Sequence, residues 1–253
     1  MGEQKDDNYN SERVLHSDAK PGQFASLSMH GNDCIRLLDF PFEIQNEVRE
    51  VIIKNWSRGI QSERTYMDSH EFKLCGYPWA CRSGDAITSR RLITALLEAL
   101  HNLRWIISIS GKATSSTMNQ DSLFFQYQPS PPDRFDWMCI GLAAGDRLYL
   151  VDAPLDLIKT VMQNLNNSIQ SDLGYSYLGA YELKLKGFPW TGTSTHVMPT
   201  HQLLLKIFSA LHDHGWSIYA SADQRYGTSN DADTWHCRRH KNWMPEVPSY
   251  SPN

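Results

Sequence analysis

The sequence contains two closely similar segments, one in each half of the chain. Residues 70–79, His-Glu-Phe-Lys-Leu-Cys-Gly-Tyr-Pro-Trp, match residues 181–190, Tyr-Glu-Leu-Lys-Leu-Lys-Gly-Phe-Pro-Trp. The match continues without a gap, so that Trp105 corresponds to Trp216 and Phe124 to Trp235, always 111 residues further on. The chain is therefore an internal duplication, and we expect it to form two copies of one structural unit.

Alternating apolar residues predict the strands of each copy, and apolar residues at helical spacing predict its helices. The first copy reads as a hairpin at 25–38, a helix around 44–52, the Gly-x-Pro-Trp strand, a helix around 92–100, and two strands at 105–110 and 122–127. The second copy repeats this ββαβαββ order between residues 138 and 238. Helical connections between neighbouring strands imply parallel pairing and hairpins imply antiparallel pairing, so we expect mixed sheets.

The predicted fold class is α/β, in the sense of an α+β two-layer sandwich made twice. The residues from Glu71 to Leu74 alternate between polar and apolar, which predicts that only one face of the sheet carries helices. We expect the two units to be related by a pseudo-twofold axis. The predicted organisation is a disordered tail at 1–23, a first repeat at 24–128, a Pro-rich linker at 129–136, a second repeat at 137–240 and an irregular tail at 241–253.

Composition and charge exclude some classes of function. The net charge is −4 and the isoelectric point is about 6.2, which argues against a general nucleic-acid or anionic-membrane binder. The polar N-terminus has no signal-peptide core, and no apolar run is long enough for a membrane helix. Five Cys without a regular framework are typical of a reducing compartment. We therefore expect a cytoplasmic or nuclear protein.

Three segments carry a resemblance to a known group: the element Glu-Phe-Lys-Leu-x-Gly-x-Pro-Trp at 71–79, the Leu-rich helix that ends at Leu100, and the Gly-Trp strand at 215–216. Together they resemble a set of uncharacterised eukaryotic proteins with a repeated Lys-Leu-Lys-Gly-x-Pro-Trp element before a helix and a Gly-Trp strand. The resemblance spans roughly residues 24–239. It supports the fold and implies no activity, cofactor or catalytic residue.

Strand alternation also predicts which side chains point away from the helices. In the first repeat these include Glu71, Lys73, Leu123 and Phe125. In the second repeat the face is more polar, and it gives a candidate ligand-binding site for a small polar ligand: Glu182, Lys184, Tyr219, His236 and Arg238. The alternative is a solvated sheet face with cross-strand ion pairs.

Other possible sites are weaker. The histidines concentrate in the second repeat, but their spacing does not predict converging ligands, so we expect neither a metal nor a cofactor. The Gly-x-Pro-Trp segments follow a strand, yet one Gly followed by Pro favours a structural bend over a phosphate loop.

Two hypotheses for function remain open. The first is a non-catalytic interaction or scaffold protein, because the residues shared by the copies are mainly apolar, Gly, Pro and Trp. The second is a small-molecule-binding protein or enzyme with its site on the open sheet face of the second repeat. The sequence does not identify catalytic residues, a protein partner or a ligand. It also does not decide whether the chain is an enzyme.

Overall fold

The structure is a computed structural model, and it describes residues 19–80, 84–112, 121–176, 178–191, 197–224 and 233–245. Its elements repeat one order twice. The first repeat contains β1 (Phe24–His30), β2 (Cys34–Leu38), α1 (Phe42–Asn55), β3 (Ile60–Tyr66), β4 (Ser69–Leu74), the short helix η1 (Pro78–Ala80), α2 (Gly84–Asn102), β5 (Trp105–Gly111) and β6 (Ser122–Tyr127). The second contains β7 (Phe135–Ala143), β8 (Arg147–Val151), α3 (Leu155–Leu165), the short helix η2 (Asn166–Ser168), β9 (Ile169–Tyr175), β10 (Ala180–Leu185), α4 (Val197–Asp213), β11 (Ser217–Ala222) and β12 (Thr234–His240). The predicted two-repeat α+β architecture is confirmed.

Each repeat builds one six-stranded sheet. Sheet 1 has the order β3-β4-β2-β1-β6-β5, and sheet 2 has the equivalent order β9-β10-β8-β7-β12-β11. All the strand pairs in both sheets are antiparallel, so the prediction of mixed sheets was wrong.

The cause of this error is one strand that the sequence pattern did not reveal. β3, and β9 in the second repeat, lie at the edge of their sheets, and most of the residues of β3 are exposed polar ones without alternation. The order is therefore ββαββαββ. Because α1 leads to the edge strand β3, and the β3–β4 hairpin then returns beside β2, neither helix connects two neighbouring strands.

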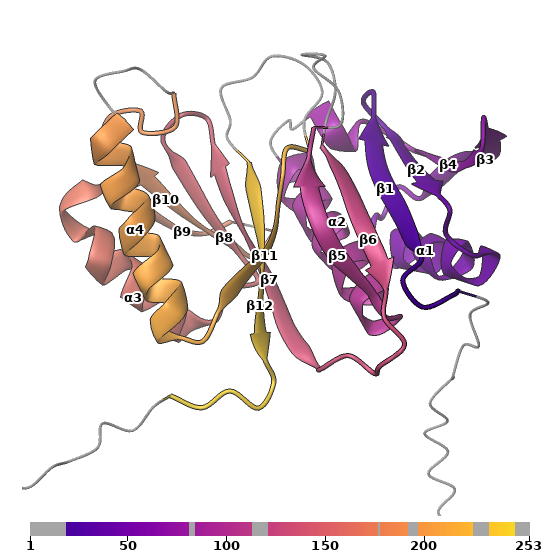
Figure 1. The fold of residues 1–253 in the computed structure, drawn as a ribbon. Coiled ribbons are helices and arrows are strands. Elements are labelled where there is room, and N and C mark those ends of the chain that lie inside the picture. Colours follow the sequence, from indigo (N-terminus) through magenta and orange to yellow (C-terminus); the bar gives the residue numbers. More distant parts are fainter. Residues whose placement is uncertain are drawn as a thin grey trace, which may run out of the picture.

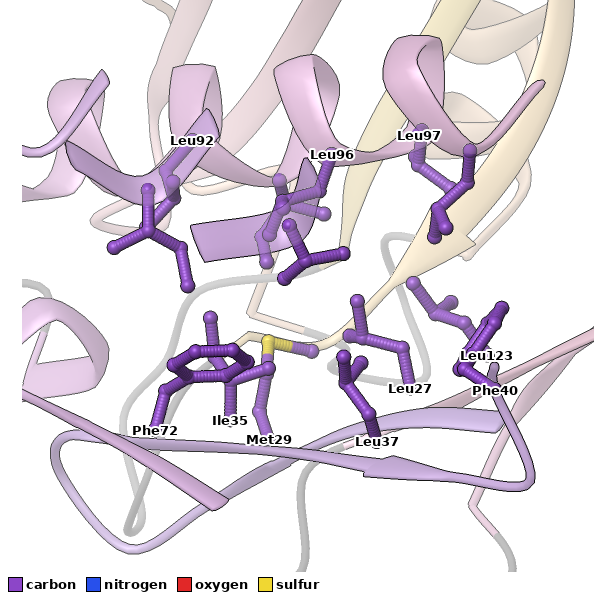
Figure 2. Close-up of a cluster of buried hydrophobic side chains, with 14 of the residues drawn as sticks. Leu27, Met29, Ile35, Leu37, Phe40, Phe72, Leu92, Leu96, Leu97 and Leu123 are labelled. Carbon is purple, nitrogen blue, oxygen red and sulfur yellow. The ribbon is translucent and has the colours of Figure 1, made fainter. Parts of the chain in front are cut away.

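The helices cover one face of their own sheet, as expected. In the first repeat, Leu92 and Leu96 of α2 face Leu27, Ile35 and Phe72 of the sheet, and all are buried (Figure 2). The second repeat has an equivalent core between sheet 2 and the helices α3 and α4.

Two residues expected on the open face of sheet 1, Leu123 and Phe125, lie in this core instead (Figure 2 shows Leu123). β6 pairs Leu123 with Leu27, whereas β12 pairs Trp235 with the equivalent Ile140. The last strands thus correspond with an offset of 112 residues, one more than the preceding segments. Since side chains alternate along a strand, this slip of one residue moves each predicted side chain to the opposite face.

In the duplicated Gly-x-Pro-Trp segments the Gly permits a bend and the Trp packs in the core. Gly76 and Gly187 adopt φ values of 82° and 71°, which favour glycine. Trp79 is buried in the first core, and its indole Nε1 donates to the carbonyl oxygen of Cys34 at 3.1 Å. Trp190 makes the equivalent bond to Arg147 at 2.9 Å. Each Trp therefore fastens the loop after the fourth strand to the start of the second strand.

The contact between the repeats places α2 between the two sheets (Figure 1). Its outer side packs on β7 of sheet 2, while β5 lies against β11. A twofold axis would also place α4 on β1, but the corresponding side of α4 is exposed at His201, Leu205 and His212. The repeats are thus joined head to tail at this helix, and the expected pseudo-twofold relation does not describe the contact.

The boundaries predicted for the repeats stay predictions. The tail expected at 1–23 lies mostly outside the described residues, and β7 begins inside the linker expected at 129–136. Among the helices that the structure describes, none combines the length and the apolar character needed to cross a membrane.

Replacing either anchoring tryptophan should cost similar stability in the two repeats. Trp79→Phe and Trp190→Phe each remove an indole donor from a carbonyl and leave space in a core. We expect each change to lower the free energy of unfolding by about 1–3 kcal/mol, measured by urea denaturation. Tyr77→Phe is the matched control, because Tyr77 is exposed and the second repeat already has Phe188 there. Losses below about 0.5 kcal/mol for both tryptophan variants would contradict this role.

Candidate functional site

The five residues predicted as a ligand site do not form one group. Tyr219, His236 and Arg238 come together on the side of sheet 2 that faces α2. Glu182 and Lys184 lie on β10, towards the opposite edge of that sheet, where the β9 strand pairs. Over β7 and β12 the expected open face is covered, because α2 packs on it.

Close contact between α2 and sheet 2 depends on a residue without a side chain. A Cβ atom at Gly141 would lie 2.6 Å from Nε and 2.9 Å from Cζ of Arg90. Arg90 is itself buried, and its Nε donates to Oγ1 of Thr234 at 3.1 Å, while its guanidinium lies 5.6 Å from the ring centre of Tyr149. Beside it, Ile87 packs on Cys139 of β7.

His236 is fully buried beneath α2, and both ring nitrogens have partners. Nδ1 lies 2.8 Å from Oγ1 of Thr94, and Nε2 lies 2.9 Å from Nε2 of Gln224. Thr94 donates its hydroxyl to the carbonyl of Arg90, and the amide nitrogen of Gln224 is a donor. Nδ1–H therefore donates to Thr94, and Nε2 accepts from Gln224, which suits a neutral imidazole.

Arg238 and Tyr219 belong to an aromatic cluster at the C-terminal end of α2. The guanidinium of Arg238 lies 4.4 Å from the ring centre of Tyr219 and 4.2 Å from that of Phe135, and its Nη1 donates to Nδ1 of His101 at 3.3 Å. The hydroxyl of Tyr219 accepts from the backbone N–H of Ile107, which belongs to β5 of the other repeat, at 2.9 Å. Burial raises the pKa of Tyr219 and lowers the pKa of Arg238 and of His101.

Glu182 forms an ion pair with β8, and Lys184 forms one with the turn that precedes β8. Glu182 accepts from Arg147 and from the hydroxyl of Tyr149, and Nζ of Lys184 lies 3.8 Å from Asp146. In the first repeat the equivalent Lys73 lies 3.9 Å from the equivalent Asp33. The retained Glu and Lys pair thus has the cross-strand role that was the alternative to a ligand site.

The geometry therefore brings together polar side chains that join the two repeats. A nucleophile, an acid or a base must be able to reach a substrate, whereas His236 is enclosed by Thr94 and Gln224. Within the described ranges, no group of three or more His, Cys, Asp and Glu is arranged to hold a metal ion.

The most important residues that the sequence analysis missed are on α2: Arg90, Thr94 and His101. They lie on the side of the helix opposite its apolar stripe, and polar residues there are typical of a solvent-exposed surface. The available signal was their position on one helix face together with the small residues Cys139 and Gly141 on the strand that they contact.

A pocket of about 360 Å³ opens beside this cluster, near the start of α3. Its charged lining includes Glu98, Asp136, Asp152, Arg239 and Lys241. Asp152 is paired with Arg91 and Asp136 with Arg239, and burial raises the pKa of Glu98. The buried Nε1 of Trp216, which also lines the pocket, has no hydrogen-bond partner among the described residues.

Comparison with known proteins agrees with the two repeats. The model of an uncharacterised domain family matches the chain twice, at residues 23–126 and 136–238, which together make up most of its length. The two matches correspond to β1–β6 and β7–β12. No curated protein and no solved structure matches the chain.

The burial of His236 predicts a specific pH dependence of stability. Burial, with a second contribution from the charge of Arg90, lowers the pKa of His236 from 6.5 to about 3. Between these values the unfolded chain binds a proton that the folded chain does not. The free energy of unfolding should therefore fall as pH drops from about 6.5 towards 3, by up to about 1.4 kcal/mol per pH unit from this group.

His236→Asn should make this dependence shallower when urea denaturation is compared between pH 7 and pH 5. His240→Asn, which removes an exposed imidazole that α2 does not enclose, is the control. His30 and His101, whose pKa values are also lowered by burial, contribute in the same direction and keep some slope in the variant. Identical slopes for the wild type and His236→Asn would show that this imidazole is not enclosed.

A side chain at position 141 should loosen the contact between the repeats. Gly141→Ala forces Arg90 to move, and we expect it to lower the free energy of unfolding by about 1–3 kcal/mol in thermal or urea denaturation. The equivalent position in sheet 1 is Ser28, on which no described helix packs. Ser28→Ala removes only the hydrogen bond to the ring of His30 at 2.8 Å, so it should cost no more than about 1 kcal/mol. Equal effects at both positions would mean that α2 does not constrain Gly141.

Proposed function

The chain belongs to this uncharacterised domain family, of which it holds two tandem copies, and we propose that it is a non-catalytic interaction protein. On this proposal the duplicated module supplies surfaces for a protein partner rather than an active site. The observation that carries the proposal is the burial of the second repeat's polar face under α2. Side chains that would suit acid–base chemistry, such as His236 and Tyr219, are used there to join the repeats.

Among the described residues, two surfaces keep exposed apolar side chains. One is the face of sheet 1 opposite α1 and α2, where Phe24, Leu38 and Ile109 are exposed. The other is the outer side of α4, where Met198 and Leu205 are exposed. Apolar side chains gathered on two such elements are typical of protein contact surfaces.

A second candidate function is the binding of a small polar ligand, and the pocket beside α2 supports it. Its volume lies in the range of small-ligand sites. Glu98 and Lys241 would offer an acceptor and a cation to such a ligand. On this alternative Arg238 would act from the adjacent cluster, while Glu182 and Lys184 would take no part.

A thermal-shift screen separates the two candidates. For a chain of this size, a ligand at one hundred times its Kd adds about 2.7 kcal/mol, which corresponds to a rise in Tm of about 5–10 °C. We expect no such rise with anions, amino acids, nucleotides or divalent metals. A rise that Lys241→Ala abolishes, while Lys206→Ala at an exposed position of α4 leaves it intact, would overturn the proposal in favour of the pocket.

A further inference from the structure

The contact inside the chain uses one surface from each repeat, and the chain carries a second, unused set of the same two surfaces. Internally, the outer side of α2 from the first repeat packs on sheet 2 of the second. Apart from β5 and β11, which lie against each other, the equivalent surfaces are the outer side of α4 and the face of sheet 1, and both carry exposed apolar residues in the described part of the chain. A contact of this head-to-tail kind leaves one half unsatisfied at each end of the molecule.

The unused helix surface is more apolar than the one that is buried. Ile87, which is 6% exposed on α2, corresponds to Met198, which is 65% exposed on α4. Thr94, which is 8% exposed, corresponds to Leu205, which is 64% exposed. An isolated helix surface of this composition gains from being covered.

The unused sheet surface also carries larger apolar side chains than its buried counterpart. Val151 is fully buried beneath α2, whereas the equivalent Leu38 of sheet 1 is exposed. At the sheet edge, Ala220 of β11 is 4% exposed because it packs into the core of the first repeat, whereas the equivalent Ile109 of β5 is 64% exposed.

We propose that a second copy of this chain covers these surfaces, with α4 of one copy docked along β1 on sheet 1 of the other. The proposal rests on the proposed interaction function and names the partner. Since each copy offers both surfaces, two such contacts can close a ring of two chains and four repeats. If the rotation that relates one copy to the next does not bring the second copy back to the first, the same contact repeats along an open chain of copies.

Pairs of residues change together between the internal contact and the proposed one. Inside the chain, the hydroxyl of Thr94 meets the imidazole of His236. The equivalent residues, Leu205 of α4 and Phe124 of β6, are both apolar, so a polar pair is replaced on both sides by an apolar pair.

The sizes of a second pair also remain complementary. Inside the chain, the long side chain of Arg90 needs Gly141 beneath it. The equivalent residues are His201, which is shorter, and Ser28, which has a Cβ atom. A third pair, Arg91 with Asp152, corresponds to Gln202 with Asp39, which keeps a donor facing a carboxylate.

These matched changes favour a second copy over an unrelated protein. An unrelated partner would not be expected to be complementary to both α4 and sheet 1. A second copy carries both surfaces, and their side chains are complementary to each other. A single chain cannot make the contact, because its α4 lies on the far side of sheet 2 from sheet 1 (Figure 1).

The test is the mass of the full chain in solution, measured by sedimentation equilibrium over a range of concentrations. We expect twice the 29.0 kDa of one chain, or larger multiples if the contact propagates. Leu205→Asp and Leu38→Asp each place a carboxylate in the proposed contact and should weaken association at least about 100-fold. Ile53→Asp, at an exposed apolar position on α1 outside the contact, is the matched control and should associate as the wild type does.

Mixing the two impaired variants gives the sharpest outcome. Leu205→Asp retains an intact sheet surface and Leu38→Asp an intact helix surface, so an equal mixture should regain one contact and form pairs that neither variant forms alone. A monomeric wild type, association that both variants leave intact, or a mixture without recovery would each overturn the proposal. If the chain is a monomer and no compound in the thermal-shift screen raises its Tm, the broader interaction function still stands. If a ligand binds the pocket, that function is overturned, whether the chain is a monomer or not.

Discussion

The structure depends on one helix that is buried on both sides. The apolar side of α2, through Leu92 and Leu96, completes the core of the first repeat, and its polar side docks on sheet 2. The second contact is close because Gly141 lets the guanidinium of Arg90 approach the strand. Without that approach the buried hydrogen bonds of Thr234 and His236 would lose their partners, and a buried polar group without a partner costs more than the bond itself contributes.

Much of the fold follows from sequence alone. The duplication, the helices, most of the strands and the role of the Gly-x-Pro-Trp segments all rest on periodicity or on residue types with one dominant use. The edge strand β3 escaped because neither of its faces is buried enough to impose alternation on Gln61 to Thr65. The face of β6 was misassigned because a single extra residue between β11 and β12 changes the offset between the copies. Since side chains alternate along a strand, a shift of one residue places each side chain on the opposite face.

The candidate site shows a different limit. Tyr219, His236 and Arg238 were correctly grouped on one face of sheet 2, since alternation fixes which side chains share a face. Alternation does not reveal whether that face meets water, a ligand or another part of the chain. The outer side of α2 is polar, and therefore resembles a solvated surface, although it is buried. The divergence between the two sheet faces thus reflects different neighbours, because α2 packs on the face of sheet 2 whereas no described helix packs on the face of sheet 1.

The central claim, that α2 encloses the polar face of sheet 2, can be examined at a single imidazole. Nitrogen NMR of the His236 ring in the folded protein reports its protonation and its tautomer directly. The account predicts a neutral ring with the proton on Nδ1 that does not titrate from pH 7 down to the onset of acid unfolding, because its pKa is lowered to about 3. A ring that titrates near 6.5 while the protein remains folded would show that the face is open to water and would contradict the docked arrangement.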